Sequence, residues 1–136
     1  AMISAMTTYK VQLVILEPNE TLDTDEINFV NLTKLKLTYL SVNRENESSE
    51  SLLFEIAFRT KNKINPSVFA VRGFDITFDT MMRLSQGKKY QETVDFTATE
   101  QIDNKFEYYK KEDGGYMNKG IYILYYDTDL TIKEAN

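Results

Sequence analysis

The stretch FAVRGFDITFDTMMRL, at residues 69–84, most constrains how this chain can fold. It is apolar enough for a buried helix, because Val71, Phe74, Phe78 and Met81 recur at the spacing of one helical face. Its interior nevertheless contains one glycine and three charged residues, which are Arg72, Gly73, Asp75 and Asp79. A fold for this chain has to place an apolar stripe and several charges on a single helix.

Residues around this stretch predict where helices begin and end. Pro66 suits the first turn of the helix, and Gly87 is well placed to end it. Upstream, a second helix is predicted over LLFEIAFRTKNK, residues 52–63, with one of three serines as its N-cap. The candidate caps are Ser48, Ser49 and Ser51.

The remaining segments are typical of strands. The β-branched, apolar run at residues 9–18 predicts a buried parallel strand, and the following residues predict a short helix capped by Asp23 or Thr24. KLKLTYLSV, at 34–42, alternates polar and apolar residues, which predicts a half-exposed strand. After residue 89 the sequence is rich in Tyr, Phe, Ile and Thr, with Gly and Asp turns between the runs, as in hairpins. The order strand–helix–strand–helix–helix with a β-rich end predicts an α/β fold, and we expect one domain over residues 1–136.

Composition excludes several classes of function. The net charge of −5 argues against binding the phosphate backbone of nucleic acids, which requires clustered Lys and Arg. The chain has no cysteine and no histidine, so disulfides, thiol catalysis, Cys/His zinc sites and a Ser-His-Asp triad are excluded. No apolar run approaches the length of a membrane span. No set of acid, base and nucleophile stands out, so we expect neither an enzyme nor a cofactor.

Glu17 is the most interesting carboxylate, with a surface position as the alternative. It directly follows the first predicted strand, and open α/β folds place ligand contacts at the carboxyl ends of their strands. Other motifs favour plain structural roles. The carboxylates Asp23, Asp25 and Glu26 fit a solvated loop better than a cation site, DGGY at 113–116 fits a turn, and the Tyr-rich GIYILYY fits core or interface packing.

The order of five motifs resembles the C-terminal part of a type I periplasmic substrate-binding protein, the branched-chain amino-acid receptor group. The motifs are the strand YKVQLVILE, the strand LKLTYLSV, the helix LFEIAFRTKNK with Phe54 and Phe58, the segment INPSVFAVRGFD, and the closing MNKGIYILYYDTD. In the segment INPSVFAVRGFD, Phe74 stands where the family has a tyrosine. The resemblance is nearest to the receptor-like region of LysM-containing bacterial envelope proteins, although the chain contains no LysM segment.

The resemblance implies a non-catalytic module that binds an amino-acid-like ligand in the periplasm or cell envelope by closing two lobes around it. Glu17 falls where these receptors hold the ligand's ammonium group, and Phe74 where an aromatic residue lines the side-chain pocket. Gly73 would allow a close approach, and the charges around it would face the cleft or the hinge. Because only part of a two-lobe fold is covered, exposed strands or helices favour a homodimer. The alternative is a structural or protein-interaction domain of the envelope that keeps the fold without a working pocket.

Overall fold

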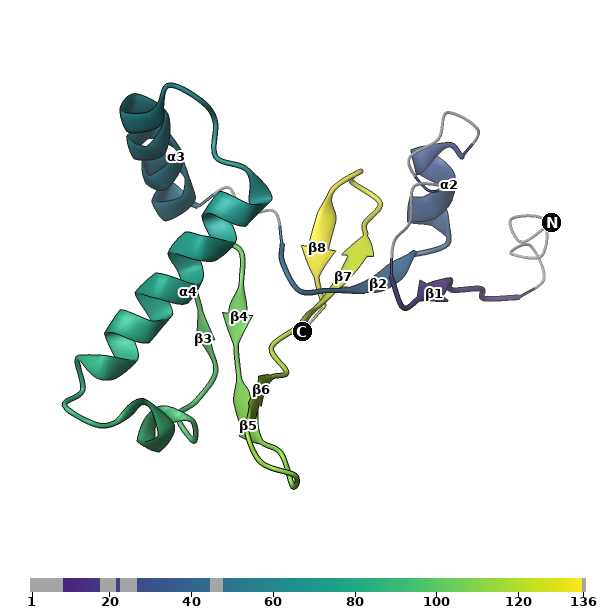
Figure 1. Cartoon of the computed structure of the whole chain (residues 1–136). Helices are drawn as coiled ribbons and strands as arrows, with labels where there is room; N and C mark the ends of the chain where they lie inside the picture. The colour runs from purple at the N-terminus through teal and green to yellow at the C-terminus, as the bar shows by residue number, and fades with distance from the viewer. Residues whose placement is uncertain (1–8, 18–21, 23–26, 45–47, 136) are drawn as a thin grey trace. The chain divides into compact units, whose positions relative to one another are not determined.

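The computed structural model describes residues 9–17, 22, 27–44 and 48–135 (Figure 1). The chain divides into two compact units. The first unit combines Ala1–Ser41 with Tyr122–Asn136, and the second unit is Val42–Ile121. The expectation of one domain over residues 1–136 stays a prediction.

The first unit contains a four-stranded sheet with the order β1-β2-β7-β8. Its strands are β1 (Val14–Ile15), β2 (Thr38–Ser41), β7 (Tyr122–Tyr126) and β8 (Ile132–Glu134). The short β1 runs parallel to β2, whereas β7 is antiparallel to both β2 and β8. Helix α2 (Phe29–Lys34) precedes β2.

The core of the first unit forms where α2 and the middle strands of the sheet present apolar side chains. Leu37 and Tyr122 are completely buried, and Leu32, Tyr39 and Leu124 pack with them. The predicted alternation is therefore confirmed at Leu37 and Tyr39. The strand itself begins only at Thr38, since α2 runs to Lys34 and Lys36 has a left-handed backbone with φ 44°.

One prediction for the N-terminal region needs correction, and another falls outside the described residues. The parallel strand expected over 9–18 is confirmed only at Val14–Ile15 among the described residues. Its expected burial is wrong, because Val14 is on the surface, 65% exposed. Among the described residues, β1 is the edge strand of its sheet and pairs only with β2. The cap of α2 is Asn28, whose side chain accepts a hydrogen bond from the backbone N–H of Val30. The two predicted caps, Asp23 and Thr24, lie outside the described residues.

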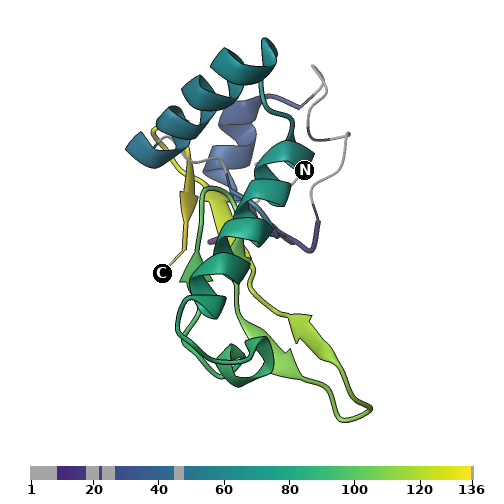
Figure 2. The ribbon, with the colours of Figure 1, turned by 60° about the vertical axis from the view of Figure 1, so that its left-hand side comes forward.

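The second unit begins with two helices, α3 (Ser49–Asn62) and α4 (Val68–Leu84) (Figure 2). A serine caps the N-terminus of each helix. The side chain of Ser48 accepts a hydrogen bond from the backbone N–H of Ser51, and the side chain of Ser67 accepts one from the N–H of Ala70. One of the three candidate serines for α3 is thereby confirmed. After α4 come η2, a 3₁₀ helix, and two short hairpins. Their bounds are η2 Tyr90–Thr93, β3 Thr99–Glu100, β4 Lys105–Phe106, β5 Tyr108–Lys110 and β6 Tyr116–Asn118.

Helix α4 buries its polar side. Its buried residues occur at every fourth position, and they are Val71, Asp75, Asp79 and Arg83. The apolar stripe expected to be buried is buried only at Val71, while Phe74, Phe78 and Met81 are exposed at 39%, 42% and 63%. The expectation that the charges face the cleft or the hinge does not hold as a cleft position for Asp75 and Asp79, because both side chains are buried. Asp75 bonds to the loop after β3, and Asp79 bonds to Arg83 of the same helix and to Thr99 of β3.

The described part of the chain thus has mixed α and β character, with the helices α2, α3 and α4 and several small sheets. In this part of the chain, none of the helices has the length and apolar character needed to cross a membrane. The strands and hairpins predicted after residue 89 are confirmed in β3 to β8, whereas the segment 93–98 of that region contains no strand.

Candidate functional site

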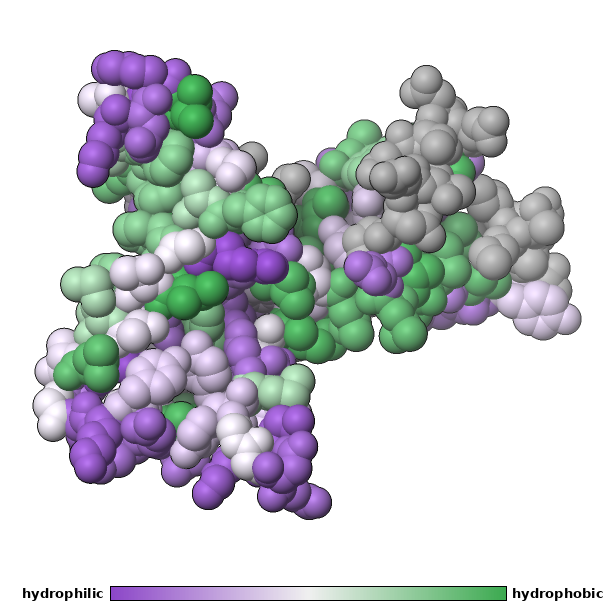
Figure 3. Space-filling view, viewed as in Figure 1, coloured by the Kyte–Doolittle hydropathy of each residue, from purple (hydrophilic) through white to green (hydrophobic). Residues whose placement is uncertain are grey.

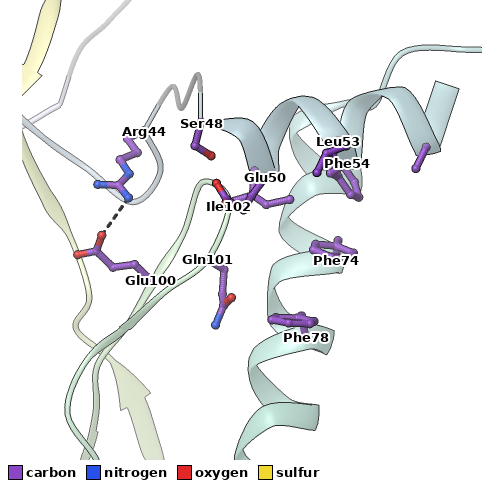
Figure 4. Close-up of a pocket in the computed structure, with 11 residues that line it drawn as sticks. Arg44, Ser48, Glu50, Leu53, Phe54, Phe74, Phe78, Glu100, Gln101 and Ile102 are labelled. Carbon is purple, nitrogen blue, oxygen red and sulfur yellow. Dashed lines mark ion pairs between the residues drawn. The ribbon is translucent and has the colours of Figure 1, made fainter.

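The second unit contains a pocket of about 720 Å³ between α3, α4 and the segment at 100–102 (Figure 4). Its wall is mostly apolar, and the apolar lining residues are Leu53, Phe54, Ala57, Phe74, Phe78 and Ile102. A smaller set of polar residues also lines it, namely Arg44, Ser48, Glu50, Glu100 and Gln101. An apolar cavity of this size with a few polar groups is typical of small-ligand sites, whose volumes are about 300–1,000 Å³.

Three phenylalanine rings form the main apolar wall of the pocket. The ring centroids of Phe54 and Phe74 are 4.6 Å apart, and those of Phe74 and Phe78 are 5.7 Å apart with nearly parallel planes. Phe54 comes from α3, while the other two come from successive turns of α4, so their spacing follows from helix geometry. All three rings share one pocket and remain accessible to a ligand.

The polar lining residues include an ion pair between Arg44 and Glu100. The Nη2 atom of Arg44 lies 2.9 Å from the carboxylate of Glu100, and the Nζ atom of Lys105 lies 3.3 Å from the same carboxylate. The backbone N–H of Arg44 also donates to the carbonyl of Asp103, 3.0 Å away. These contacts connect the start of the second unit to the β3–β4 hairpin beside the pocket.

Glu50 lies in the first turn of α3 and contributes the other lining carboxylate. The pKa of Glu50 is below its usual value, because a backbone N–H hydrogen bond at Glu50 and the hydroxyls of Ser49 and Ser48 stabilise the charged form. The Ser49 hydroxyl donates to the carboxylate at 3.1 Å. A carboxylate at a helix N-terminus is also favoured by the helix dipole.

Asp75 stabilises the part of the pocket wall that residues 101–102 form. Its buried carboxylate accepts hydrogen bonds from the backbone N–H groups of Ile102 (3.1 Å), Asp103 (2.9 Å) and Asn104 (3.0 Å). It also accepts one from the side-chain Nδ2 of Asn104 at 2.8 Å. One side chain of α4 thus fixes the turn that carries Gln101 and Ile102 into the pocket.

A second buried polar network lies one turn further along α4. The Nε atom of Arg83 is 2.7 Å from the carboxylate of Asp79, and both side chains are almost completely buried. Arg83 also donates to the carbonyl of Thr93 (2.8 Å) and to the hydroxyl of Thr99 (3.0 Å). Its guanidinium carbon lies 5.0 Å from the centroid of the Tyr108 ring. Burial of Tyr108 raises the pKa of its phenol above the usual value.

The structure places the two predicted site residues in different units. Phe74 lines the pocket of the second unit, whereas Glu17 is an exposed residue at a bend just after β1 in the first unit. Participation of both residues in binding one ligand therefore stays a prediction. The carboxylates Asp23, Asp25 and Glu26 lie outside the described residues.

Two other sequence motifs have the structural roles that the sequence predicts for them, a turn and core packing. The DGGY turn joins β5 to β6, and its glycines Gly114 and Gly115 have φ of 94° and 79°, which favour glycine. In the Tyr-rich strand, Tyr122 and Tyr126 are buried in the core of the first unit, so core packing is confirmed there.

Sequence reasoning missed the polar residues that build the site. Arg44 and Glu50 lie in a polar segment without periodicity, and Glu100 lies in the β-rich part after residue 89. Nothing in these local patterns indicates a shared pocket. The recurrence of Asp75, Asp79 and Arg83 at intervals of four was a usable signal, since it predicts one polar face on α4. That face could have been recognised as a second candidate for the buried side.

The polar groups that line this pocket are hydroxyl, carboxylate, amide and guanidinium groups. The Ser48 hydroxyl oxygen caps α3, and the lining residues include no cysteine, histidine or lysine. Among the described residues, no group of three or more acidic side chains is arranged to hold a metal ion. Comparison with protein families, with curated proteins and with solved structures finds no match for this chain.

Proposed function

We propose that the chain is a non-catalytic binding module, and that its second unit binds a small amphipathic, amino-acid-like ligand. The observation that carries this proposal is the three-phenylalanine wall of a pocket of about 720 Å³. The rings of Phe74 and Phe78 are about two-fifths exposed, so a ligand that covers them removes apolar surface from water. Burial of a whole Phe side chain contributes about 1.5–3 kcal/mol, so covering two partly exposed rings is a substantial gain.

The way in which the polar residues are fixed also supports a binding role. Ligand sites gain specificity from polar groups that are held in place before the ligand arrives. Here Asp75 holds the segment of Gln101 and Ile102, and the ion pair holds Arg44 and Glu100 together. The ligand would therefore enter a wall whose geometry is already set by buried hydrogen bonds.

The resemblance to type I periplasmic substrate-binding proteins adds a mechanism and a location to the proposal. Two lobes would close around the ligand, with Glu17 pairing with its amino group and Phe74 packing against its side chain. The location would be the periplasm or cell envelope of a bacterium. The partial substrate-binding-protein fold is part of this proposal as well.

Binding can be tested by calorimetric titration with the twenty amino acids and with their amides. We expect at least one ligand with an apolar side chain to bind, and Phe74→Ala to weaken its binding about tenfold or more, because the mutation removes the central ring of the wall. The matched control is Phe69→Ala, since Phe69 is on the same helix, highly exposed and not among the pocket residues. Equal effects of the two mutations, or no binding by any ligand, would refute the proposal.

The second candidate is a structural or protein-interaction domain of the envelope. The observation that favours it is that α3 has no buried residue among those described, while apolar side chains remain exposed on α3 and α4 outside the pocket, as at Leu52, Ile56 and Met81. On the face seen in Figure 3, hydrophobic surface gathers over neighbouring parts of these helices. Light scattering tests this candidate: a dimer that Met81→Lys converts to a monomer would support it, and a monomer at all concentrations would count against self-association.

A further inference from the structure

The charges that line the pocket differ in how far they are already paired. The lining contains one cation, Arg44, and two carboxylates, Glu50 and Glu100, so its formal charge is negative. Glu100 is paired with Arg44 at 2.9 Å and with Lys105 at 3.3 Å. Its charge is therefore largely balanced within the protein.

Glu50 differs from Glu100 in its surroundings. Within the part of the chain that the structure describes, no lysine or arginine forms an ion pair with Glu50. Its partners are hydroxyls and a backbone N–H, which lower the pKa of the carboxyl and keep it charged at neutral pH. In the view of Figure 4, Glu50 lies between the ion pair and the phenylalanine side chains.

The aromatic wall also favours positive charge. The face of a phenyl ring carries negative partial charge, so a cation close to the ring is attracted to it. Three such rings, Phe54, Phe74 and Phe78, line the same pocket as Glu50. An anion there would meet the ring faces and a carboxylate without a cationic partner, whereas a cation is complementary to both.

We propose that the pocket takes a small organic cation, with its apolar body against Phe54, Phe74 and Phe78 and its ammonium group at Glu50. This inference rests on the proposed function and names the chemical class of its ligand. It also assigns the ammonium group to a carboxylate of the same unit as the aromatic wall, in place of Glu17. The pocket volume of about 720 Å³ fits a whole small molecule and is much larger than a single lysine side chain requires.

Three probes of nearly equal shape separate charge from apolar contact: 3-phenylpropylammonium, 3-phenylpropanol and 3-phenylpropionate. We expect the cation to bind the intact chain about tenfold more tightly than the anion, with the neutral alcohol between them. In Glu50→Gln, the preference for the cation should fall to the smaller part that the phenyl rings contribute, while the affinity for the alcohol stays the same. In the matched control Glu17→Gln, the preference should be unchanged.

Each outcome of the titrations has a separate meaning. Equal or tighter binding of the anion by the wild type, or a cation preference that survives Glu50→Gln and is lost in Glu17→Gln, overturns the assignment to Glu50. Binding of the alcohol without any charge preference overturns this inference and leaves the proposed function standing. Failure of all three probes to bind contradicts this inference, and the proposed function falls as well only if the amino acids and their amides also fail to bind. The N-acetyl amide of lysine serves as a fourth probe, because it mimics a lysine residue within a peptide. Tighter binding of this probe than of 3-phenylpropylammonium would mean that the ligand is a peptide lysine and not a free amine.

Discussion

The carboxylate of Asp75 accepts hydrogen bonds from both the backbone N–H and the side-chain Nδ2 of Asn104, at 3.0 and 2.8 Å. The two residues are 29 positions apart, so this contact ties the middle of α4 to the loop between β3 and β4. Two further N–H groups of that loop donate to the same carboxylate. Asp75 thus supplies the acceptor for three backbone N–H groups of this loop.

Asp75→Asn should destabilise the chain by about 2–4 kcal/mol, because an amide replaces one acceptor oxygen by a donor that faces buried N–H groups. Urea unfolding followed by circular dichroism measures the change. The matched control is Asp95→Asn, since Asp95 is an exposed residue of the same unit, and its effect should stay within about 0.5 kcal/mol. Equal midpoints for the two variants would show that the carboxylate does not hold the loop.

The ion pair of Asp79 and Arg83 should show strong coupling in a double-mutant cycle. Arg83→Met leaves the buried Asp79 carboxylate without its cation and should cost about 3–5 kcal/mol. Asp79→Leu should cost a similar amount because it leaves the guanidinium without its carboxylate. The double variant removes both charges, so we expect it to lose at least about 1 kcal/mol less than the two single effects added together. Additive free energies of unfolding would contradict a coupled pair.

The helices of the second unit were largely predictable because their signals are local. The serine that caps α3 and the polar residues after it lie within a few positions of each other. Pro66 marks the start of α4, although it precedes the cap Ser67 and, contrary to the prediction, does not lie in the first turn. Such caps act within one helical turn, so the sequence contains all the information needed. The hairpin turn at Gly114 and Gly115 was predictable for the same reason.

The buried side of α4 was not predictable from periodicity alone. Helix α4 has an apolar stripe and a charged stripe, and either could face inward. The choice depends on loop N–H and carbonyl groups about 10 to 29 residues away that need partners, at Thr93 and at the turn before Asn104. The pocket residues Arg44, Glu50 and Glu100 likewise come from separate segments of the sequence, so no local pattern predicts that they line one pocket.

Leu37→Ala should be among the most damaging apolar substitutions in the first unit. Its side chain is completely buried in the core cluster, so truncation should cost about 2–5 kcal/mol. Leu52→Ala makes the same chemical change on α3, where the side chain is exposed, and should cost less than about 1 kcal/mol. Thermal unfolding of the two variants measures the difference. A similar loss for both would mean that α3 is packed in solution against something that covers Leu52.

The stability that the turn between β7 and β8 contributes should depend on pH, because the turn contains the charged side chain of Asp129. Asp129 accepts hydrogen bonds from the Lys133 ammonium and from the hydroxyl and backbone N–H of Thr131. These contacts lower the pKa of Asp129 from 3.8 to about 2. Because the folded-state pKa lies below the unfolded one, the stabilisation is complete above pH 3.8 and is lost as the pH falls towards about 2.

The pKa of Asp129 can be measured from its carboxyl chemical shift in an NMR titration. The ammonium of Lys133 is the first cause of the shift, so Lys133→Met should move the titration midpoint of Asp129 back towards 3.8. Thr131→Val removes only the hydroxyl donor and keeps the backbone N–H, so it should cause a smaller shift in the same direction. A wild-type midpoint near 3.8 would mean that the lysine does not contact this turn in solution. A low midpoint that persists in Lys133→Met would assign the shift to the hydrogen bonds from Thr131 instead.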